Sequence, residues 1–450
     1  MVASNEIKES EIQVPVNNNL TFKEKLRNYL KKGIDKESEK ILEIQKSIQS
    51  PFLTNIMKIA TFTGNDDFYT IFIPMLFWCD VSEYGLMRKE LFKQLNFLSR
   101  SLVLSFAYST FITGWIKDYL SLPRPKSPPV IRKLKKSYVD YEYGCPSTHS
   151  ANACVLAFNF LFFFLSFIKP IVSTSHLLMI FIYLTTLTFI FLVSLSRIYF
   201  GMHSFLDVVV GLIIGVFVTV INWLFICSVY ESYFYSSVLG PIIQVLFHRL
   251  LLIYVHPDPE HYCPCFEDSY SFFCFFDGIA IGSWLDKKYF GKHSLVKTYK
   301  MKYGVVKGLK NTFKKEPPVF NKINQSFLRY SLLNKLYDIF GLKVILLIRY
   351  LLGLIILITY KKLTRKVILF IADIIFHNNK NSESNKSKTD LNKIEKDNKM
   401  EKIDEDNLIN HKKKYHLPRH SAVLISRNVE YIGLGLILYA NIHLFYYLKI

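Results

Sequence analysis

The chain has 450 residues, of which 50% are hydrophobic and 16% aromatic, and it carries a formal net charge of +20. This apolar content is too high for an ordinary water-soluble domain, and the apolar residues gather in runs that approach the ~20 residues needed to cross a bilayer. The lysines lie mainly between these runs, as on the cytosolic flanks of membrane spans, so the basic excess does not indicate a nucleic-acid partner.

The apolar runs predict an all-α protein, a polytopic transmembrane helical bundle of about eight to ten spans. Residues 1–46 are polar, lack the pattern of a cleavable signal peptide and are expected in the cytosol. The stretch 47–64 is only moderately apolar and fits either a poor span or an interfacial helix. A run at 367–376 is too short to cross by itself. The stronger candidate spans are 67–80, 94–116, 151–169, 177–196, 204–228, 240–256, 271–285, 340–360 and 431–449.

The connectors between spans are of two kinds. Residues 287–339 and 377–428 are rich in Lys, Asn and Ser, and we expect a basic cytosolic loop and a disordered linker there. Residues 117–150 instead combine Pro, Arg, Lys, Ser and His between two spans, so chemistry is expected in this catalytic loop. The predicted organisation is a polar segment 1–46, a core 47–230, further spans 231–286, a loop 287–339, a membrane-associated segment 340–376, a linker 377–428 and a C-terminal span 429–450.

Glycosylation sequons at Asn19, Asn324 and Asn385 fall in segments assigned to the cytosol.

The seven cysteines have neither a zinc-finger nor a redox spacing, so no disulfide framework is expected. Four lie in apolar runs, where a thiol serves as a small hydrophobe: Cys79, Cys154, Cys227 and Cys274. Cys263 and Cys265, with His256 and His261 nearby, form the one possible metal cluster, but CxC is not the CxxC spacing of a zinc knuckle. We therefore predict neither a metal nor another cofactor.

Three short polar stretches, 117–125, 146–149 and 196–207, lie next to span ends. Two apolar runs separate the second stretch from the third, and two crossings return the chain to the side where it started. All three stretches are therefore expected on one face of the membrane. Basic residues flank the preceding connector and mark it as cytosolic: Arg88, Lys89, Lys93 and Arg100. The site is then expected on the opposite side, which is the lumen for an endomembrane protein.

The residues in these stretches suit a phosphate. Lys117, Arg124 and Arg197 can neutralise an oxyanion with nearly two charges, and Ser147 adds a hydroxyl donor. Each also fits a structural role by itself, since Lys117 can anchor a span end and Ser147 can cap a helix. Their convergence with complementary chemistry favours a phosphate site.

Two histidines supply the remaining groups for phosphoryl transfer. His203 and Asp207 are four residues apart, so on a helix they share one face, and Asp207 can hold one ring nitrogen while the other attacks. His149 has no such partner nearby in the sequence and is the better candidate for the general acid.

These residues match the three-part signature of the type 2 phosphatidic acid phosphatase superfamily, which also includes the vanadium haloperoxidases. The signature reads KxxxxxxRP from Lys117, PSTH ending at His149, and SRxxxxxHxxxD ending at Asp207. Thr148 stands where the superfamily usually has Gly. That Thr, the surrounding LPRPKSPPV and RIYFGMHSFLDVVVG, and the later CPCFEDS resemble the sphingosine-1-phosphate phosphatase branch. The resemblance covers roughly residues 50–290 and, loosely, the final span.

The resemblance implies a helical bundle with a phosphatase core of the vanadium haloperoxidase-like type. It also implies an endoplasmic reticulum membrane protein whose site faces the lumen, and which hydrolyses sphingoid long-chain base 1-phosphates through a phosphohistidine without a metal. His203 would be the nucleophile, Asp207 its orienting carboxylate and His149 the acid. The implied phosphate-binding residues are Lys117, Arg124, Ser147, Thr148 and Arg197.

Two kinds of alternative remain open at this point. Within the same chemistry, the substrate could be phosphatidate, lysophosphatidate or a dolichyl or other isoprenoid phosphate. The motif residues recognise the phosphate group and not the lipid tail. In another class, the protein could be a transporter or a scaffold with a vestigial motif. Asn159, Asn222 and His443 could line a transport path, although isolated polar residues in spans more often hydrogen-bond between helices.

Overall fold

The computed structural model describes residues 21–78, 89–133, 142–169, 175–261, 263–290, 342–383 and 422–448. Every regular element in these ranges is helical, which confirms the all-α prediction. The elements before the catalytic loop are α1 (Phe22–Ser47), α2 (Pro51–Phe62), α3 (Asp66–Trp78) and α4 (Lys89–Leu120). The next are α5 (Thr148–Phe163), η2 (Phe164–Ile168), α6 (His176–Tyr199), α7 (Phe205–Ile221), η3 (Asn222–Ile226), α8 (Cys227–Val229) and η4 (Tyr230–Phe234). The last are α9 (Leu239–Leu250), η5 (Leu251–Val255), α10 (Cys265–Phe290), α13 (Leu342–Glu383) and α15 (Ala422–Leu448).

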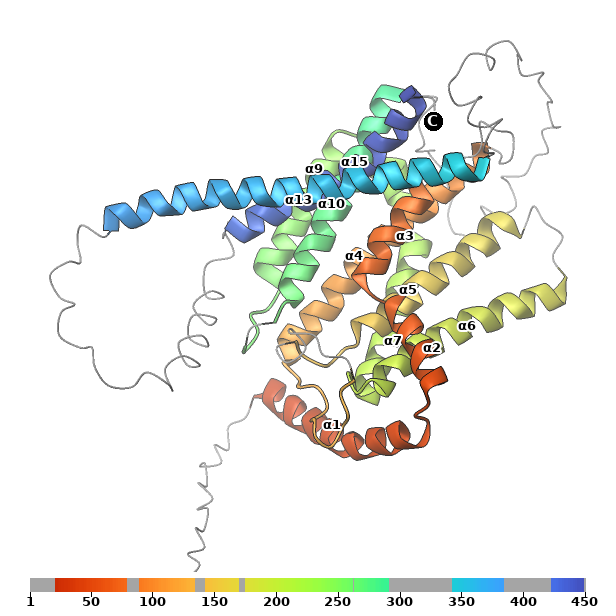
Figure 1. Cartoon of the computed structure of the whole chain (residues 1–450), viewed down its shortest axis with the longest axis vertical. Coiled ribbons are helices and arrows are strands. Elements are labelled where there is room, and N and C mark those ends of the chain that lie inside the picture. The colour runs from red at the N-terminus through yellow and green to blue at the C-terminus, as the bar shows by residue number, and fades with distance from the viewer. Residues whose placement is uncertain are drawn as a thin grey trace, which may run out of the picture.

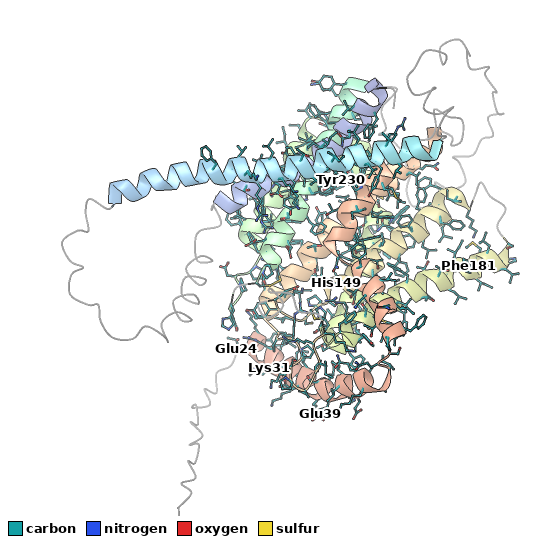
Figure 2. The ribbon with its side chains drawn as sticks, viewed as in Figure 1. Glu24, Lys31, Glu39, His149, Phe181 and Tyr230 are labelled. Atoms are coloured by element: carbon teal, nitrogen blue, oxygen red, sulfur yellow. A yellow bond between two sulfur atoms is a disulfide. The ribbon has the colours of Figure 1, made fainter. Side chains whose placement is uncertain are left out.

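Three helical stretches in the described chain are long and apolar enough to cross a membrane: Thr148–Ile168, His176–Tyr199 and Phe205–Ile226. They coincide with three consecutive predicted spans. The side chains of α6 point largely outward, as Phe181 does at 65% exposure (Figure 2), which suits contact with lipid. Helices α4, α10, α13 and α15 are also long but contain more charged or polar residues. Helix α2 has 12 residues and is too short to cross alone.

The C-terminal elements depart in detail from the predicted segments. Helix α13 is one continuous helix of 42 residues that absorbs the short run 367–376 and continues into the predicted linker. It packs on α15 and α3 and runs across α10 and α15 (Figure 1). Most of the predicted loop 287–339 and linker 377–428 lies outside the described residues, as do the three sequon asparagines.

Helix α5 lies at the centre of the catalytic half of the bundle, in contact with α4, α6 and α7 (Figure 1). Two glycines of α7 allow the closest of these approaches. A Cβ atom at Gly211 would lie 2.4 Å from the Ser147 carbonyl oxygen, and one at Gly215 would lie 2.3 Å from that of Ala151. Because α5 carries the PSTH motif at its first turn, this packing positions the motif beside the start of α7.

Polar side chains inside the bundle hydrogen-bond between helices, as expected for isolated polar residues in spans. The Asn159 Oδ1 atom accepts from Ser101 Oγ at 2.9 Å, and Asn222 Nδ2 donates to the same Ser101 hydroxyl at 2.9 Å. His443 Nε2 lies 2.9 Å from Asp286 Oδ1. All three residues that could have lined a transport path are therefore engaged in helix-helix contacts.

Arg100 corrects one step of the sidedness argument. Its guanidinium is buried and forms a paired contact with Glu231, at 2.6 Å from Nε and 2.9 Å from Nη2. Burial of a lone charge is costly, so this pair keeps Arg100 inside the bundle instead of on a cytosolic flank. Arg100 therefore does not count among the basic residues that mark the preceding connector as cytosolic, and the side chains of Arg88, Lys89 and Lys93 lie outside the described residues.

Helix α1 lies across the catalytic end of the bundle (Figure 1). The Gln45 side chain donates to the Ile131 carbonyl oxygen at 2.8 Å and accepts from the Ile131 N–H at 2.9 Å, which joins α1 to the catalytic loop. Glu37 Oε2 accepts the N–H of Phe205 at 2.9 Å, at the start of α7. Residues 22–47 therefore lie on the same side of the membrane as the catalytic loop. A cytosolic N-terminal segment and a lumenal site cannot both be correct.

We expect Gly215→Ala to lower the thermal unfolding midpoint of the detergent-solubilised protein. The added methyl group meets backbone that cannot move without separating α5 from α7, and overpacking of this kind costs about 1–3 kcal/mol. Gly33→Ala is the matched control, since a Cβ at Gly33 of α1 has no atom within 4 Å. Equal midpoints for the two variants would contradict the close α5–α7 contact.

Candidate active site

The eight residues predicted for the site all lie at one end of α4, α5, α6 and α7. This follows from alternating chain direction, because the C-terminal ends of α4 and α6 meet the N-terminal ends of α5 and α7. They are Lys117, Arg124, Ser147, Thr148, His149, Arg197, His203 and Asp207. The prediction that three separate stretches share one face is confirmed.

Backbone hydrogen bonds join these stretches directly. The Ser147 N–H donates to the Asp207 carbonyl oxygen at 2.8 Å, which links the start of α5 to the start of α7. The Gly144 N–H donates to the Leu122 carbonyl oxygen at 2.8 Å, which closes the two arms of the catalytic loop. The site is therefore held by main-chain contacts as well as by its side chains.

His203 is buried and its ring is oriented from both sides. Arg124 Nη1 lies 3.2 Å from His203 Nε2, and since a guanidinium only donates, Nε2 is the acceptor. The ring proton is then on Nδ1, which faces Asp207 Oδ2 at 3.5 Å. Burial, reinforced by the charges of Arg124 and Arg197, holds the pKa of His203 well below its ordinary value. A neutral imidazole with its Nε2 lone pair turned toward cations is suited to attack phosphorus.

The local geometry that brings Asp207 to His203 differs from the predicted helical turn. Helix α7 begins at Phe205, so His203 precedes the helix and the pair does not form a regular helical turn. Asp207 instead closes a capping box, in which Oδ2 accepts the Ser204 N–H at 2.8 Å and the Ser204 hydroxyl accepts the Asp207 N–H at 3.2 Å. The cap fixes the carboxylate beside the His203 ring.

Ser147 is the N-cap of α5, the structural role that the sequence also allowed. Its hydroxyl accepts the Ser150 N–H at 3.4 Å and the Ser150 hydroxyl at 3.0 Å. Thr148 and His149 form the first turn of the helix, where backbone N–H groups lack partners within the helix and favour an anion. The start of α5 therefore adds main-chain donors to the cations.

His149 has a partner that the sequence did not indicate. Its Nε2 atom lies 2.7 Å from Asn65 Oδ1, in the turn between α2 and α3. The preceding Gly64 leaves room for the ring, since a Cβ there would lie 2.9 Å from His149 Cδ2. Asn65 is 84 residues from His149 in the sequence, so the residues near His149 in the sequence could not indicate this partner.

Glu142 is the second residue that sequence reasoning missed. Its carboxylate contacts Lys117 Nζ through Oε1 and Arg124 Nη2 through Oε2, the latter at 2.8 Å. Burial opposes its ionisation, but the charges of Lys117 and Arg124 hold the pKa of Glu142 well below its usual range. A permanent carboxylate thus lies between two of the three predicted phosphate-binding cations.

Comparison with known proteins assigns this region to a family. Residues 99–230 match the PAP2 superfamily. The chain contains a PAP2 domain. The matched residues include all eight predicted site residues and Glu142, so the resemblance read from the motifs is confirmed.

Named relatives extend the match beyond the PAP2 domain. A dihydrosphingosine 1-phosphate phosphatase of Schizosaccharomyces pombe is 34% identical over 259 residues, 58% of this chain and 59% of the relative. A dihydrosphingosine 1-phosphate phosphatase of Saccharomyces cerevisiae is 30% identical over 263 residues, 58% of this chain and 60% of the relative. The human sphingosine-1-phosphate phosphatase 2 is 30% identical over 251 residues, 53% of this chain and 54% of the relative. The chain thus spans less than two thirds of each relative, and no solved structure matches it significantly.

Helix α2, outside the PAP2 domain, orients the third cation. Arg197 Nη1 donates to the Thr61 hydroxyl at 3.0 Å, and Thr61 Oγ1 lies 2.9 Å from the hydroxyl of Ser196. The moderately apolar stretch 47–64, undecided from sequence, therefore forms part of the wall of the site.

The CxC pair lies beside the PAP2 domain and contains a disulfide, although the sequence predicted no disulfide framework. Cys263 and Cys265 form a disulfide, and buried Asp118 lies within 4.8 Å of both sulfur atoms. The bond occupies both sulfur atoms that a metal site there would use.

We expect the stability of the protein to fall on acidification because of His203. Its pKa is lower in the folded chain than in the unfolded chain, so below about pH 6.5 the unfolded state binds a proton that the folded state does not. The contribution of His203 to the free energy of unfolding therefore decreases as pH falls. Between about pH 7.5 and 5.5 the unfolding midpoint of the wild type should fall relative to that of His203→Gln. His176→Gln, at an exposed histidine of α6, is the control, and identical pH profiles for all three proteins would refute the assignment.

Proposed function

We propose that the protein is an integral membrane lipid phosphatase that hydrolyses sphingoid long-chain base 1-phosphates to the free base and phosphate, without a metal. The observation that carries the proposal is the neutral His203, whose Nε2 atom faces Arg124 within a group of three cations. The three relatives named above support the substrate class, since each is named as a phosphatase of a sphingoid 1-phosphate.

The reaction follows from the roles available to the side chains. Lys117, Arg124 and Arg197 bind the phosphoryl oxygens, and the N–H groups at the start of α5 assist them. His203 Nε2 attacks phosphorus while the ester bond breaks, and His149 gives a proton to the departing lipid oxygen. Water then attacks the phosphohistidine, His149 takes a proton from it, and phosphate leaves with His203 restored. Asp207 stabilises the charge that develops on the His203 ring.

The decisive experiment measures phosphate release by the solubilised protein with EDTA present, using dihydrosphingosine 1-phosphate and phosphatidate. We expect EDTA-resistant turnover that favours the sphingoid substrate and that His203→Ala abolishes without loss of protein, because the attacking atom is gone. Equal turnover of both lipids would keep the chemistry and reject the substrate class. Full turnover by His203→Ala would reject the mechanism, and no turnover by the wild type would favour a transporter or scaffold.

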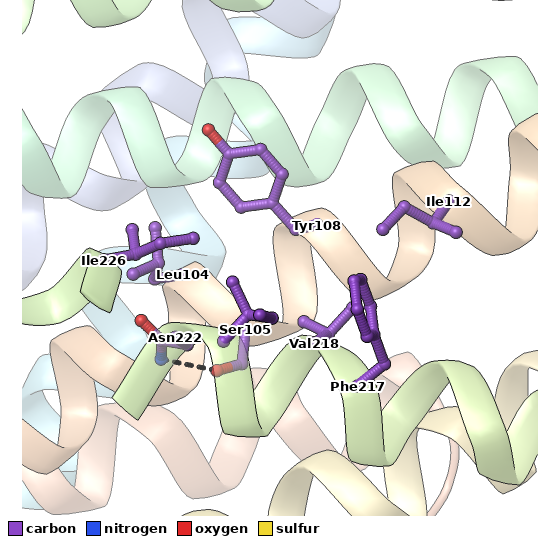
Figure 3. A pocket seen from close by; sticks show the side chains of 9 residues that line it. Leu104, Ser105, Tyr108, Ile112, Phe217, Val218, Asn222 and Ile226 are labelled. Carbon is purple, nitrogen blue, oxygen red and sulfur yellow. Dashed lines mark hydrogen bonds between the residues drawn. The ribbon is translucent and has the colours of Figure 1, made fainter. Parts of the chain in front are cut away.

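An apolar cavity between α4 and α7 suits part of the lipid tail. It has a volume of about 90 Å³, and Tyr108, Ile112, Phe217 and Val218 are among the residues that line it (Figure 3). Ile112 is five residues before Lys117 on α4, which is ~8 Å along the helix, so the cavity begins below the phosphate site. A chain attached to a bound phosphate would enter the cavity as it descends between the two helices.

We expect Val218→Trp to discriminate against long tails. A large ring at this position fills the cavity, so KM should rise several-fold for an 18-carbon sphingoid 1-phosphate and change little for an 8-carbon one. Val216→Trp is the matched control, because Val216 lies at almost the same depth on α7 but is 38% exposed and does not line the cavity. Equal effects of Val218→Trp on the two chain lengths would exclude the cavity as the tail site.

For localisation we propose the endoplasmic reticulum membrane with the site facing the lumen. Since α1 lies at the catalytic end, the sequon Asn19-Leu20-Thr21, next to α1 in the chain, would then also be lumenal. We expect an electrophoretic shift of the expressed protein that is removed by endoglycosidase and by Asn19→Gln. A cytosolic site predicts no Asn19-dependent shift, and a tag before residue 19 that protease removes from sealed microsomes would establish that orientation.

A further inference from the structure

Glu142 neutralises the cations that the substrate phosphate needs. Besides its carboxylate contacts with Lys117 and Arg124, its backbone carbonyl oxygen accepts Arg124 Nε at 3.1 Å. The main chain of Glu142 is therefore tied to Arg124, while its side chain is 18% exposed. A phosphate that binds these cations must displace the carboxylate, and the tied backbone keeps the displaced carboxylate beside the phosphate.

A carboxylate next to a bound phosphate is unfavourable unless a positive charge accompanies the phosphate. Sphingoid 1-phosphates supply that charge, because their ammonium group is on the carbon next to the one that carries the phosphate ester. Phosphatidate has no cation in that position. The repulsion between Glu142 and a phosphate without a neighbouring cation thus weakens the binding of phosphatidate. Specificity often depends on such unfavourable contacts with the wrong ligand.

The charges next to Glu142 agree with this pairing. The ammonium group of a sphingoid 1-phosphate offsets one of the two negative charges of a doubly ionised phosphate, and phosphatidate has no such group beside Glu142.

We propose that Glu142 forms an ammonium subsite: after the phosphate displaces its carboxylate from Lys117 and Arg124, the carboxylate binds the ammonium group of the sphingoid base. This inference rests on the proposed phosphatase function and assigns its headgroup selectivity to one residue. The new contact is a charge-assisted hydrogen bond, which replaces the two that Glu142 gives up.

The test compares two substrates that differ only at the nitrogen, dihydrosphingosine 1-phosphate and its N-acetyl derivative, in which no ammonium group remains. The wild type should prefer the free amine. In Glu142→Gln, kcat/KM for the free amine should fall by ~10-fold or more relative to the N-acetyl substrate, as expected for loss of a hydrogen bond between charged groups. Glu142→Asp keeps the charge and should retain most of the preference.

Glu260→Gln is the matched control, because Glu260 is a carboxylate at the same end of the bundle that pairs with Arg27 and not with a phosphate-binding cation. It should leave the substrate ratio unchanged. Equal losses for both substrates in Glu142→Gln would mean that Glu142 only positions Lys117 and Arg124, and would overturn the subsite. A wild type without preference between the two substrates would overturn it too, even if Glu142→Gln did not fold. Failure of the phosphatase function itself would be recognised separately, as absence of turnover of either substrate by the wild type.

Discussion

The structure at the catalytic end depends on holding three cations close to one another around a neutral histidine. Lys117, Arg124 and Arg197 repel each other, and each is stabilised by an oxygen from elsewhere in the chain. The Glu142 carboxylate pairs with Lys117 and Arg124, and the Thr61 hydroxyl accepts a hydrogen bond from Arg197. Burial keeps the His203 ring neutral, and the same cations reinforce this because a protonated ring beside them would add a fourth positive charge. In the proposed reaction, phosphate binding and the nucleophilicity of His203 therefore both depend on these three cations.

The helices outside the PAP2 domain complete this arrangement. Helix α1 attaches to the catalytic loop through Gln45, and α2 with the following turn supplies Thr61 and Asn65. Thr61 and Asn65 are neutral hydrogen-bonding groups that orient Arg197 and His149 without adding charge.

The membrane-embedded part imposes its own constraint, since polar groups there must find partners within the protein. Asn159 and Asn222 share the Ser101 hydroxyl, and Arg100 is neutralised by Glu231. Such contacts fix how the helices rotate against one another, and the glycines of α7 fix how closely α5 approaches. These interhelical contacts set the packing of the buried middle segments of the helices. The helix ends that carry the candidate site come together as a result.

The sequence by itself determined the helical class, the core spans and the eight residues of the candidate site. It could do so because span length, crossing parity and motif spacing are local properties of the chain. Glu142, Asn65 and the burial of Arg100 were decided only by the tertiary structure, since each depends on a partner far away in the sequence. The contact of His203 with Asp207 was predicted from the sequence in part and decided by the tertiary structure in part. Their spacing brought them near, but the helix cap formed by Ser204, and not a regular turn, set their geometry.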